Sequence, residues 1–573
     1  MKKLGLYLAF GVSMLALGIL PAAAYDSVSD ARLANPEPQN WLQYRGNYAG
    51  WGYSPLAKIN DKNVSKLNVA WVYSTGQLEG HQSPPIVNNG VMFVTSPGNL
   101  VIALDAKTGS ELWRYQHQVP DELMQLHPTN RGVALYGDKV YFGTTDAKLI
   151  ALDAVTGKEA WQVPVADWKS GYYITLAPLA AEGKILVGSS GGELGVRGFV
   201  AAFDATTGKE AWRTFTIPAP GEPGGDSWPA DSYQRGGGST WISGSYDPKT
   251  HVTYWGTGNA APWMPDTRPG DNLYANSVIA LDIDTGKLKG FHQYHQADAW
   301  DWDEVSTPML IDYQHEGKTI SGLVHAGRDG YLWLLERKPD SIGYVKSWPF
   351  VRQDVFTSVD PKSGRPTYDP SKTPGTGKTV HFCPSLWGGK DWFPEAYNPQ
   401  TKLLYVPANN NLCSELTGEK VSYKAGKLYI GVALSNILTN VRMDDKALEH
   451  VGEVQAWDLS TGKQVWTHKY KEMNWGPLLT TGGDLVFGGG TNDRKFHAFN
   501  AKTGDMLWEF PTNSGVTGVP STFEVDGEQY IAVQSGWGVD AQRMQGAFDA
   551  VLPHKTVVPQ GGAIWVFKLP KQG

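Results

Sequence analysis

The sequence has few charged residues and no long basic run. Asp, Glu, Lys and Arg make up 19% of the 573 residues, against a usual share of ~25%, and the formal net charge is −7. A nucleic-acid partner is therefore excluded, because phosphate binding needs a basic surface. A disordered polymer is also excluded, since such chains lack aromatic residues and this one has 23 tryptophans.

Apolar runs of membrane-spanning length are missing after residue 24. Before that point, Lys2 and Lys3 precede the apolar run Leu4–Leu20, which ends in small residues. This order predicts a signal peptide over residues 1–24. The chain from 25 to 573 is then expected in the periplasm without a membrane span. A retained N-terminal anchor is the alternative.

Cysteine is nearly absent, since only Cys383 and Cys413 occur. The sequence contains no Cys-x-x-Cys-His motif, which excludes covalently attached c-type haem. In an exported protein two cysteines most simply form a disulfide. Two buried free thiols are the alternative.

Glycine is plentiful, with 66 residues, and five glycines mark an internal repeat. The pattern is Ala-x-Asp/Asn-x-x-Thr-Gly-x-x-x-Trp, and its glycines are Gly109, Gly157, Gly208, Gly462 and Gly504. A sixth copy, around Gly286, has Gly290 in the tryptophan position. Each copy predicts a strand, a turn capped by the Asp or Asn side chain and closed by glycine, and a second strand.

The repeat spacing is typical of a β-propeller. Glycines of neighbouring copies lie 48, 51 and 42 residues apart (109 to 157, 157 to 208 and 462 to 504), which suits blades of four strands. The sequence therefore predicts an all-β propeller of eight blades, forming one domain over 25–573. Longer gaps indicate a blade with an insertion or one that lost the signature. The repeat tryptophans are interpreted as packing residues between blades.

Oxygen-bearing side chains collect where the repeat is interrupted. Three such segments are 188–195, 255–263 and 298–304. They supply four candidate ligands without histidine or thiolate: Glu193, Asn259, Asp301 and Asp303. Such a set suits Ca²⁺ or another hard cation of high coordination number.

From about Asn40 to Phe567 the chain resembles the PQQ-dependent (quinoprotein) alcohol dehydrogenases of the methanol/ethanol dehydrogenase family. The most specific stretch runs from Trp255 to Glu304 and includes Ala-Trp-Asp-Trp-Asp. The resemblance implies an eight-bladed propeller with tryptophan-docked sheets. It also implies that Cys383 and Cys413 form the family's structural disulfide.

The resemblance further implies roles for individual residues. Glu193, Asn259 and Asp301 match the metal ligands, Asp301 matches the catalytic base, and Arg328 matches the basic residue beside the reactive quinone carbonyl. The implied cofactor-binding residues are Arg131, Thr175, Ser190, Gly191, Gly192, Trp241, Arg328, Asp391, Trp475 and Gly476. Trp263 and Trp537 are expected to shape the substrate pocket.

Asp303 bears on the identity of the metal. Calcium-using members have a small residue at this position, whereas members resembling the lanthanide-dependent type have an aspartate. An additional anionic ligand favours a trivalent ion over a divalent one. We therefore expect a lanthanide(III), with Ca²⁺ as the alternative.

The chain also departs from the family pattern. The family's adjacent cysteines over the quinone are replaced by Gln125 and Leu126, a common glutamate by Gln82, and a common asparagine by Asp391. These departures keep open a PQQ-dependent sugar, polyol or bulky secondary-alcohol dehydrogenase. A non-catalytic envelope scaffold is the more distant alternative.

The function implied by the resemblance is oxidation of an alcohol to an aldehyde or ketone by hydride transfer to metal-bound PQQ. Electrons are expected to pass to a separate soluble cytochrome c, because the chain has no haem motif. The prediction allows for a homodimer.

Overall fold

A computed structural model describes residues 25–78, 80–443, 449–551 and 555–571. The predicted signal peptide, 1–24, lies outside these residues. Within them, eight antiparallel sheets of four strands each account for the main body of the fold. No helix in the described ranges has both the length and the apolar composition needed to cross a membrane.

The first four sheets follow the chain without interruption. They are β3–β6 (Ile86–Asn88, Val91–Ser96, Leu100–Asp105, Glu111–Gln116), β7–β10 (Ala134–Tyr136, Lys139–Gly143, Lys148–Asp153, Glu159–Pro164), β11–β14 (Leu179–Ala181, Lys184–Gly188, Phe199–Asp204, Glu210–Phe215) and β15–β18 (Ser245–Asp247, Val252–Gly256, Ser277–Asp282, Leu288–Gln293).

The second four sheets complete the set. They are β19, β22, β23 and β24 (Met309–Leu310, Gly322–Ala326, Tyr331–Lys338, Ser341–Pro349), then β28, β29, β32 and β33 (Ala396–Asn398, Leu403–Asn409, Gly452–Asp458, Lys463–Tyr470), then β34–β37 (Leu479–Thr481, Leu485–Gly488, Lys495–Asn500, Met506–Pro511), and last β38, β39, β40 and β2 (Ser521–Val525, Glu528–Ser535, Ala563–Lys568, Asn68–Ser74). β1 (Tyr53–Ser54) adds to β34 in parallel.

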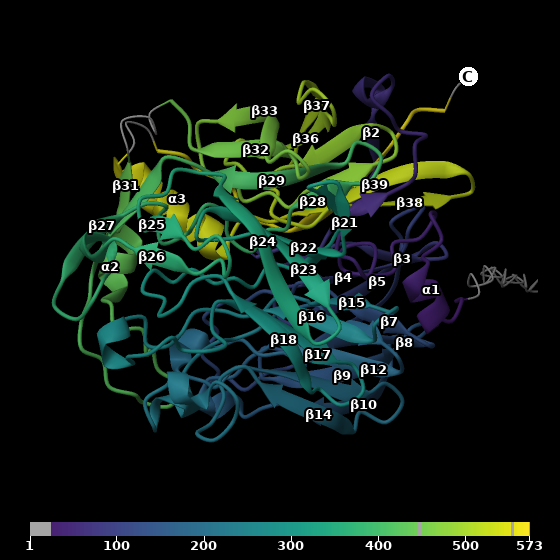
Figure 1. Cartoon of the computed structure of the whole chain (residues 1–573). Helices are drawn as coiled ribbons and strands as arrows, with labels where there is room; N and C mark the ends of the chain where they lie inside the picture. Colours follow the sequence, from purple (N-terminus) through teal and green to yellow (C-terminus); the bar gives the residue numbers. More distant parts are fainter. Residues whose placement is uncertain (1–24, 79, 444–448, 552–554, 572–573) are drawn as a thin grey trace, which may run out of the picture.

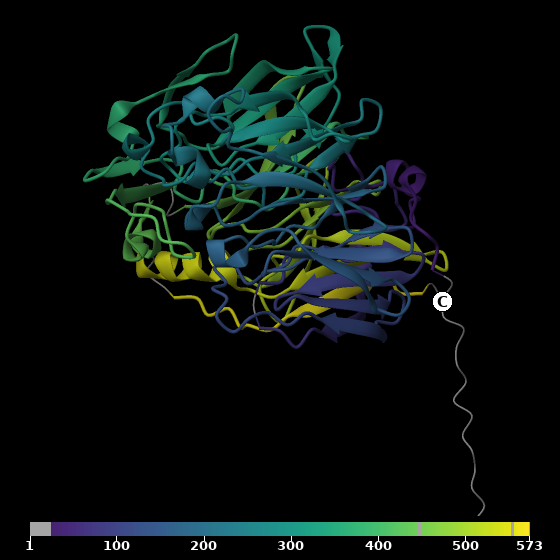
Figure 2. The ribbon, with the colours of Figure 1, turned by 90° about the horizontal axis from the view of Figure 1, so that it is seen from below.

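The two ends of the chain close the ring, because N-terminal β2 pairs with C-terminal β40. Figures 1 and 2 show the yellow C-terminal strands beside the purple and blue strands of the N-terminal half. Pairing of the two ends fixes the last blade to the first.

Tryptophans dock seven of the eight blades onto the next, as the repeat predicts. The Trp113 ring lies so close to Gly157 (φ +68°) that a Cβ there would come within 2.5 Å of it. Trp113 Nε1 donates to Ala154 O at 3.0 Å, within the turn of the following repeat. The same stacking recurs for Trp71 on Gly109, Trp161 on Gly208, Trp212 on Gly286, Trp348 on Gly462 and Trp466 on Gly504.

Two junctions lack this stacking. Gly290, in the tryptophan position, lies against the backbone of Ser341 in the next sheet, so no side chain fits there. At the other junction, Trp508 donates through Nε1 to Leu67 O at 3.1 Å. Each sheet therefore contacts its successor around the ring, which confirms the prediction of an all-β propeller.

Segments outside the blades gather at one end of the molecule. They include β25 (Phe356–Val359), β26 (Pro366–Tyr368), β27 (Thr379–Phe382), β31 (Val441–Met443), α2 (Leu434–Thr439) and α3 (Val539–Val551), all at the left of Figure 1. β30 (Leu412–Thr417) pairs with β27 and β31. The predicted disulfide between Cys383 and Cys413 joins this group. α1 (Asp30–Ala34) lies apart from it.

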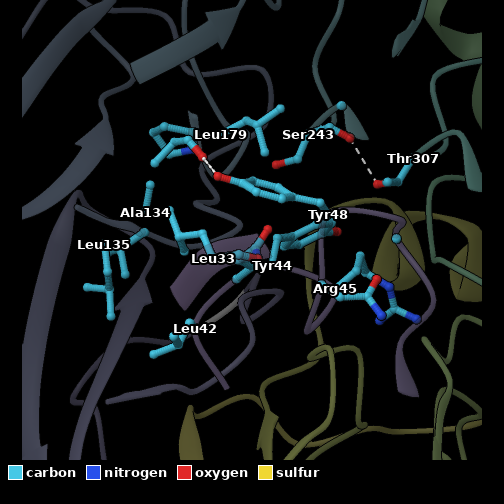
Figure 3. Close-up of a pocket in the computed structure, with 17 residues that line it drawn as sticks. Leu33, Leu42, Tyr44, Arg45, Tyr48, Ala134, Leu135, Leu179, Ser243 and Thr307 are labelled. Atoms are coloured by element: carbon cyan, nitrogen blue, oxygen red, sulfur yellow. Dashed lines mark hydrogen bonds between the residues drawn. The ribbon is translucent and has the colours of Figure 1, made fainter. Parts of the chain in front are cut away.

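A small cavity of about 20 Å³ lies under the N-terminal segment. Its lining is mainly apolar and contains no carboxylate or histidine. Tyr48 Oη donates to Ala180 O at 2.9 Å and Thr307 Oγ1 donates to Ser243 O at 2.9 Å. Figure 3 shows Tyr48, Ser243 and Thr307 beside this cavity. The residues around this cavity pack the N-terminal segment against the blades. They include no carboxylate or histidine that could act as an acid or base.

Candidate active site

A larger cavity of about 330 Å³ opens at the end where the inserted segments gather. Most of the predicted site residues line it: Arg131, Thr175, Ser190, Gly191, Glu193, Trp241, Trp263, Asp301, Asp303, Arg328 and Asp391. They come from loops and short turns outside the blade strands. The interruptions of the repeat therefore meet in one place.

Three carboxylates form the acidic centre of the cavity. Glu193, Asp301 and Asp303 each place an oxygen within 4.8 Å of the others. Glu193 sits in the 3-10 turn Gly192–Leu194, whose start at Gly191 has φ +108° and lies so close to Gly171 O that a side chain is excluded. Asp301 has φ +61°, a left-handed conformation that is uncommon for a non-glycine residue and that aspartate adopts more readily than most.

The acidic centre is short of positive charge. Burial raises the pKa of Asp301, and Arg328 only partly offsets this. Burial likewise raises the pKa of Asp303 to about 7, against the attraction of Arg328 and with the repulsion of Glu193 added. Within the described residues Asp301 Oδ1 is buried and accepts no hydrogen bond. A cation here would relieve both the repulsion and the missing bond.

Asn259 supplies an uncommitted amide beside this centre. The residue is fully buried, and neither Nδ2 nor Oδ1 has a hydrogen-bond partner among the described residues. Its backbone N–H donates to Asp303 Oδ1 at 2.5 Å. A Cβ on Gly192 would lie 3.4 Å from Asn259 Oδ1, so the amide is beside the Glu193 turn. Gly192 and Asn259 themselves lie just behind the cavity lining.

Arg328 is surrounded by carboxylates. Its guanidinium nitrogens lie 3.7 Å from Asp301, 3.5 Å from Asp303 and 3.6 Å from Asp391. Nη2 also donates to Leu386 O at 2.9 Å. Together these contacts fix a positive charge at the edge of the acidic centre.

Glu304 holds the Arg328 loop from behind. Its carboxylate accepts the backbone N–H of Arg328 at 3.2 Å and of Asp329 at 3.1 Å, and His325 Nε2 lies 2.5 Å away. Burial alone would raise the pKa of Glu304, but hydrogen bonds from His295 and His325 lower it to about 2. Sequence reasoning assigned Glu304 no role, because its partners are backbone groups and distant histidines.

Aromatic rings enclose the opposite wall. The Arg131 guanidinium lies 4.8 Å from the ring centroids of both Trp241 and Trp392, and it donates to Thr175 Oγ1 at 2.6 Å. Trp241 Nε1 donates to Asp303 Oδ2 at 3.0 Å. Trp241 thereby links the aromatic wall to the acidic centre. Trp392, next to Asp391, was not predicted.

Besides Gly192 and Asn259, three predicted residues lie outside the cavity lining: Trp475, Gly476 and Trp537. Trp475 packs edge-on against Trp387, with centroids 6.0 Å apart, and Trp387 rather than Trp475 reaches the cavity. Gly476 lies against the backbone of Gly489 and Gly490, and Trp537 packs over Gly515. Their contacts with cofactor or substrate stay predictions.

The outer part of the cavity was not predicted as a whole. It is lined by Leu126, His127, Leu386, Trp387, Leu428, Ile430, Leu434, Ile437, Leu438, Asp540 and Arg543. Several come from α2 and α3, which lie outside the repeat. Of these residues only Leu126 carried a sequence signal, as the replacement for a family cysteine.

Comparison with protein families gives a match over most of the fold. The family model described as the glucose/ethanol/alcohol dehydrogenase beta-propeller domain, named PQQ, matches residues 41–340 and 469–531. Quinoprotein alcohol dehydrogenase PedH from Pseudomonas putida is 38% identical over 98% of this chain and 97% of its own length. Quinoprotein ethanol dehydrogenase from Pseudomonas putida is 40% identical over 97% of this chain and 94% of its own length.

Two further comparisons concern the metal and the three-dimensional structure. The lanthanide-dependent methanol dehydrogenase of Methylacidiphilum fumariolicum is 36% identical over 97% of this chain and 96% of its own length. The solved structure of a europium-containing methanol dehydrogenase superposes with a TM-score of 0.87 at 35% identity, covering 94% of this chain and 100% of that one.

Proposed function

The chain belongs to the PQQ-dependent quinoprotein alcohol dehydrogenases, and from this premise we propose that the 330 Å³ cavity is the active site and that Asp301 is its catalytic base. The observation that carries the proposal is the set of unsatisfied buried groups at the acidic centre. Asp301 Oδ1 and the Asn259 amide have no hydrogen-bond partner among the described residues. A folded protein keeps such groups buried when a ligand completes them.

The donor set fits a hard cation. We propose that Glu193, Asn259, Asp301 and Asp303 hold it, since carboxylate and amide oxygens are the ligands that such ions prefer. Three of these four groups are anionic, and Asp303 lies within 4.8 Å of the other two carboxylates. The high negative charge favours a lanthanide(III) over Ca²⁺, and one relative is named a lanthanide-dependent enzyme.

The cavity also fits a flat, acidic cofactor. Trp241 offers an aromatic wall, while Arg131, Thr175 and Ser190 place hydrogen-bonding groups beside it. Arg131 Nε has no partner in the described part of the chain, so it can bind a carboxylate. When bound, PQQ supplies the two-electron acceptor for the carbinol hydride.

Asp301, Arg328 and Glu304 have the remaining roles in the proposed reaction. Asp301 lines the cavity and would accept the alcohol proton as general base. Arg328, 3.7 Å from Asp301, favours the ionised carboxylate and would stabilise negative charge that develops nearby. Glu304 holds the Arg328 backbone in place. The buried position of the centre limits competition by water.

The sequence supports a proposal for the electron acceptor and for the cellular location of the protein. We propose that a separate soluble cytochrome c accepts the electrons, because the sequence has no Cys-x-x-Cys-His motif. Removal of residues 1–24 would release the mature domain, 25–573, into the periplasm. A homodimer is compatible with this proposal.

Reconstitution tests the proposal directly. Purified cofactor-free protein is assayed for dye-linked alcohol oxidation with PQQ alone, with La³⁺ or Ca²⁺ alone, and with each pair. We expect activity only when PQQ and a metal are both present, and more with La³⁺ than with Ca²⁺. Inactivity across a broad panel of alcohols and sugars, together with no binding of PQQ, would refute it.

The metal preference needs its own variant. Asp303→Ser removes one anionic ligand, so we expect the activity supported by La³⁺ to be lost. Retention of the La³⁺-supported activity in this variant would count against the lanthanide assignment.

A further inference from the structure

The acidic centre draws its groups from two segments that are separate in the chain. Asn259 begins the segment 259–263, whereas Asp301 and Asp303 belong to the segment 298–303. The backbone N–H of Asn259 reaches Asp303 Oδ1 at 2.5 Å. A metal ion held by both segments needs them at a fixed separation, because all its ligand oxygens have to lie at bonding distance together.

Arg268 forms hydrogen bonds to both segments from a fully buried position. In the first segment, Nε donates to Pro262 O at 2.6 Å and Nη2 donates to Trp263 O at 3.0 Å. Ala260 O, 3.4 Å from Nη2, is a further acceptor. In the second segment, Nη2 donates to Asp298 O. One guanidinium group therefore joins the two segments.

Asn272 holds the guanidinium in place. Its Oδ1 accepts a hydrogen bond from Arg268 Nη1 at 2.6 Å, and its Nδ2 donates to Arg268 O at 3.0 Å. Burial lowers the pKa of Arg268 to about 10, against the attraction of Asp298, so the side chain is charged at neutral pH. Its bonds to the backbone carbonyls are therefore charge-assisted, which makes them stronger than bonds between neutral groups.

Asp298 extends this contact to Asp301. Its carbonyl accepts from Arg268, while its carboxylate Oδ2 accepts the backbone N–H of Asp301 at 3.2 Å. The neighbours of Asp301 in the chain, Trp300 and Trp302, are fully buried, and their rings stack with centroids 5.0 Å apart. The backbone around Asp301 is therefore fixed from both sides.

We propose that Arg268 is a positioning residue that joins the segment of Asn259 to the segment of Asp301 and thereby sets the separation of two proposed metal ligands. The proposal rests on the proposed function, since it keeps the roles given there to Asn259 and Asp301. Arg268 is not part of the cavity lining. It therefore acts through these two segments and not by contact with the substrate.

Binding of La³⁺ and of Ca²⁺ to the cofactor-free protein, measured by isothermal titration calorimetry, tests the proposal. In Arg268→Lys a single ammonium replaces the planar fork of five N–H donors, so it cannot bond both segments in the same way. We expect the dissociation constant of the bound ion to rise about 10- to 100-fold, as is typical for residues that orient metal ligands. Arg268→Met, which has no donor, should bind the ion more weakly still.

Arg45→Lys is the matched control. Arg45, labelled in Figure 3, is 2% exposed, and its Nη2 also donates to two backbone carbonyls, Glu395 O at 2.6 Å and Leu478 O at 2.8 Å. It lines the small cavity under the N-terminal segment and not the larger one. Both lysine variants should unfold at a lower urea concentration than wild type, but only Arg268→Lys should bind the ion more weakly. Equal weakening in both variants would overturn the proposal.

The reconstituted holoenzyme gives a second readout. With PQQ and the metal ion at saturation, we expect kcat of Arg268→Lys for ethanol to fall about tenfold, because a displaced base slows the reaction. KM should change by less than about threefold, since no substrate contact is removed. A change confined to KM would overturn the proposal.

A milder variant decides the matter if the Arg268 variants do not fold. Asn272→Gly removes the oxygen that holds Arg268 Nη1, and glycine suits the backbone there because Asn272 has φ +58°. We expect the dissociation constant of the ion to rise about threefold, and an unchanged value would overturn the proposal. If wild-type protein binds neither ion, with or without PQQ, the proposed function itself is contradicted.

Discussion

Two clusters of potential metal-binding side chains share the segment 295–304 and differ in how far the protein satisfies their carboxylates. The inner cluster, Glu193, Asp301 and Asp303, surrounds the cavity. The second cluster consists of His295, Glu304 and Asp329, all fully buried. We call it the outer cluster because none of its residues lines the cavity. Both bring together residue types that bind metal ions. Their hydrogen bonds, however, assign them different roles.

In the outer cluster Glu304 is satisfied by the protein itself. Both of its carboxylate oxygens accept hydrogen bonds, and its histidine partners lower its pKa to about 2. In the inner cluster Asp301 Oδ1 is left without a bond in the described residues, and burial raises the pKa of Asp301. Glu304 is therefore a structural brace, whereas the inner cluster is suited to bind a cation.

The largest effect is expected from Asp301→Asn. This substitution keeps the shape of the side chain and removes the proposed base, so kcat/KM should fall about 10³-fold. Folding should be retained, because the variant removes an unfavourable buried charge. Dye-linked activity of the reconstituted enzyme and urea unfolding of the cofactor-free protein measure the two effects. Activity within tenfold of wild type would exclude Asp301 as the base.

The outer cluster should respond in the opposite way. Glu304→Ala leaves the N–H groups of Arg328 and Asp329 and the His325 ring without their acceptor, so the free energy of unfolding should fall by about 3 kcal/mol. Glu304→Gln keeps one acceptor oxygen and should lose less. Urea unfolding of the cofactor-free protein compares both with Asp301→Asn. Equal stability of Glu304→Ala and wild type would mean that the network is not a brace.

Cation binding distinguishes the clusters without any turnover. At 100 times its dissociation constant, La³⁺ should stabilise the cofactor-free protein by about 2.7 kcal/mol. Glu193→Gln should weaken this effect, since it removes one anionic ligand. Zn²⁺, which suits a set of histidine and carboxylate ligands, should give no comparable shift, because the carboxylates of Glu304 and Asp329 already accept hydrogen bonds from the protein. Thermal unfolding measures all three. Equal stabilisation by Zn²⁺ would contradict the assignment.

The sequence predicted the parts of the molecule that depend on local pattern. Each blade turn is encoded within eleven residues, so the copy around Gly157 revealed both the strands and the docking of Trp113. Glu304 was missed for the opposite reason. Its partners are backbone N–H groups and the side chains of His295 and His325, and no residue pattern records such contacts.

The same limit applies to the wall of the cavity. α2 and α3 are joined to the site by packing between segments about 100 residues apart in sequence. Their aliphatic residues have no signature that separates the wall of a cavity from ordinary core. The candidate ligand set was predicted from the resemblance to a known family, whereas leucines carry no such signal because they are common everywhere.

The smallest effect is expected at Asp391. This residue bonds a backbone group, as Glu304 does, and lies near Arg328, as Asp301 does. Its Oδ1 accepts the backbone N–H of Trp392 at 2.7 Å and lies 3.6 Å from Arg328 Nη1. In Asp391→Asn the amide oxygen can still accept the Trp392 N–H. The variant loses only the negative charge of the carboxylate, and burial already raises the pKa of that group. The free energy of unfolding should therefore change by less than about 1 kcal/mol, and kcat/KM should fall only a few-fold. A hundredfold loss of La³⁺ affinity would instead make Asp391 a member of the inner cluster, because a charge outside the ligand set should contribute far less.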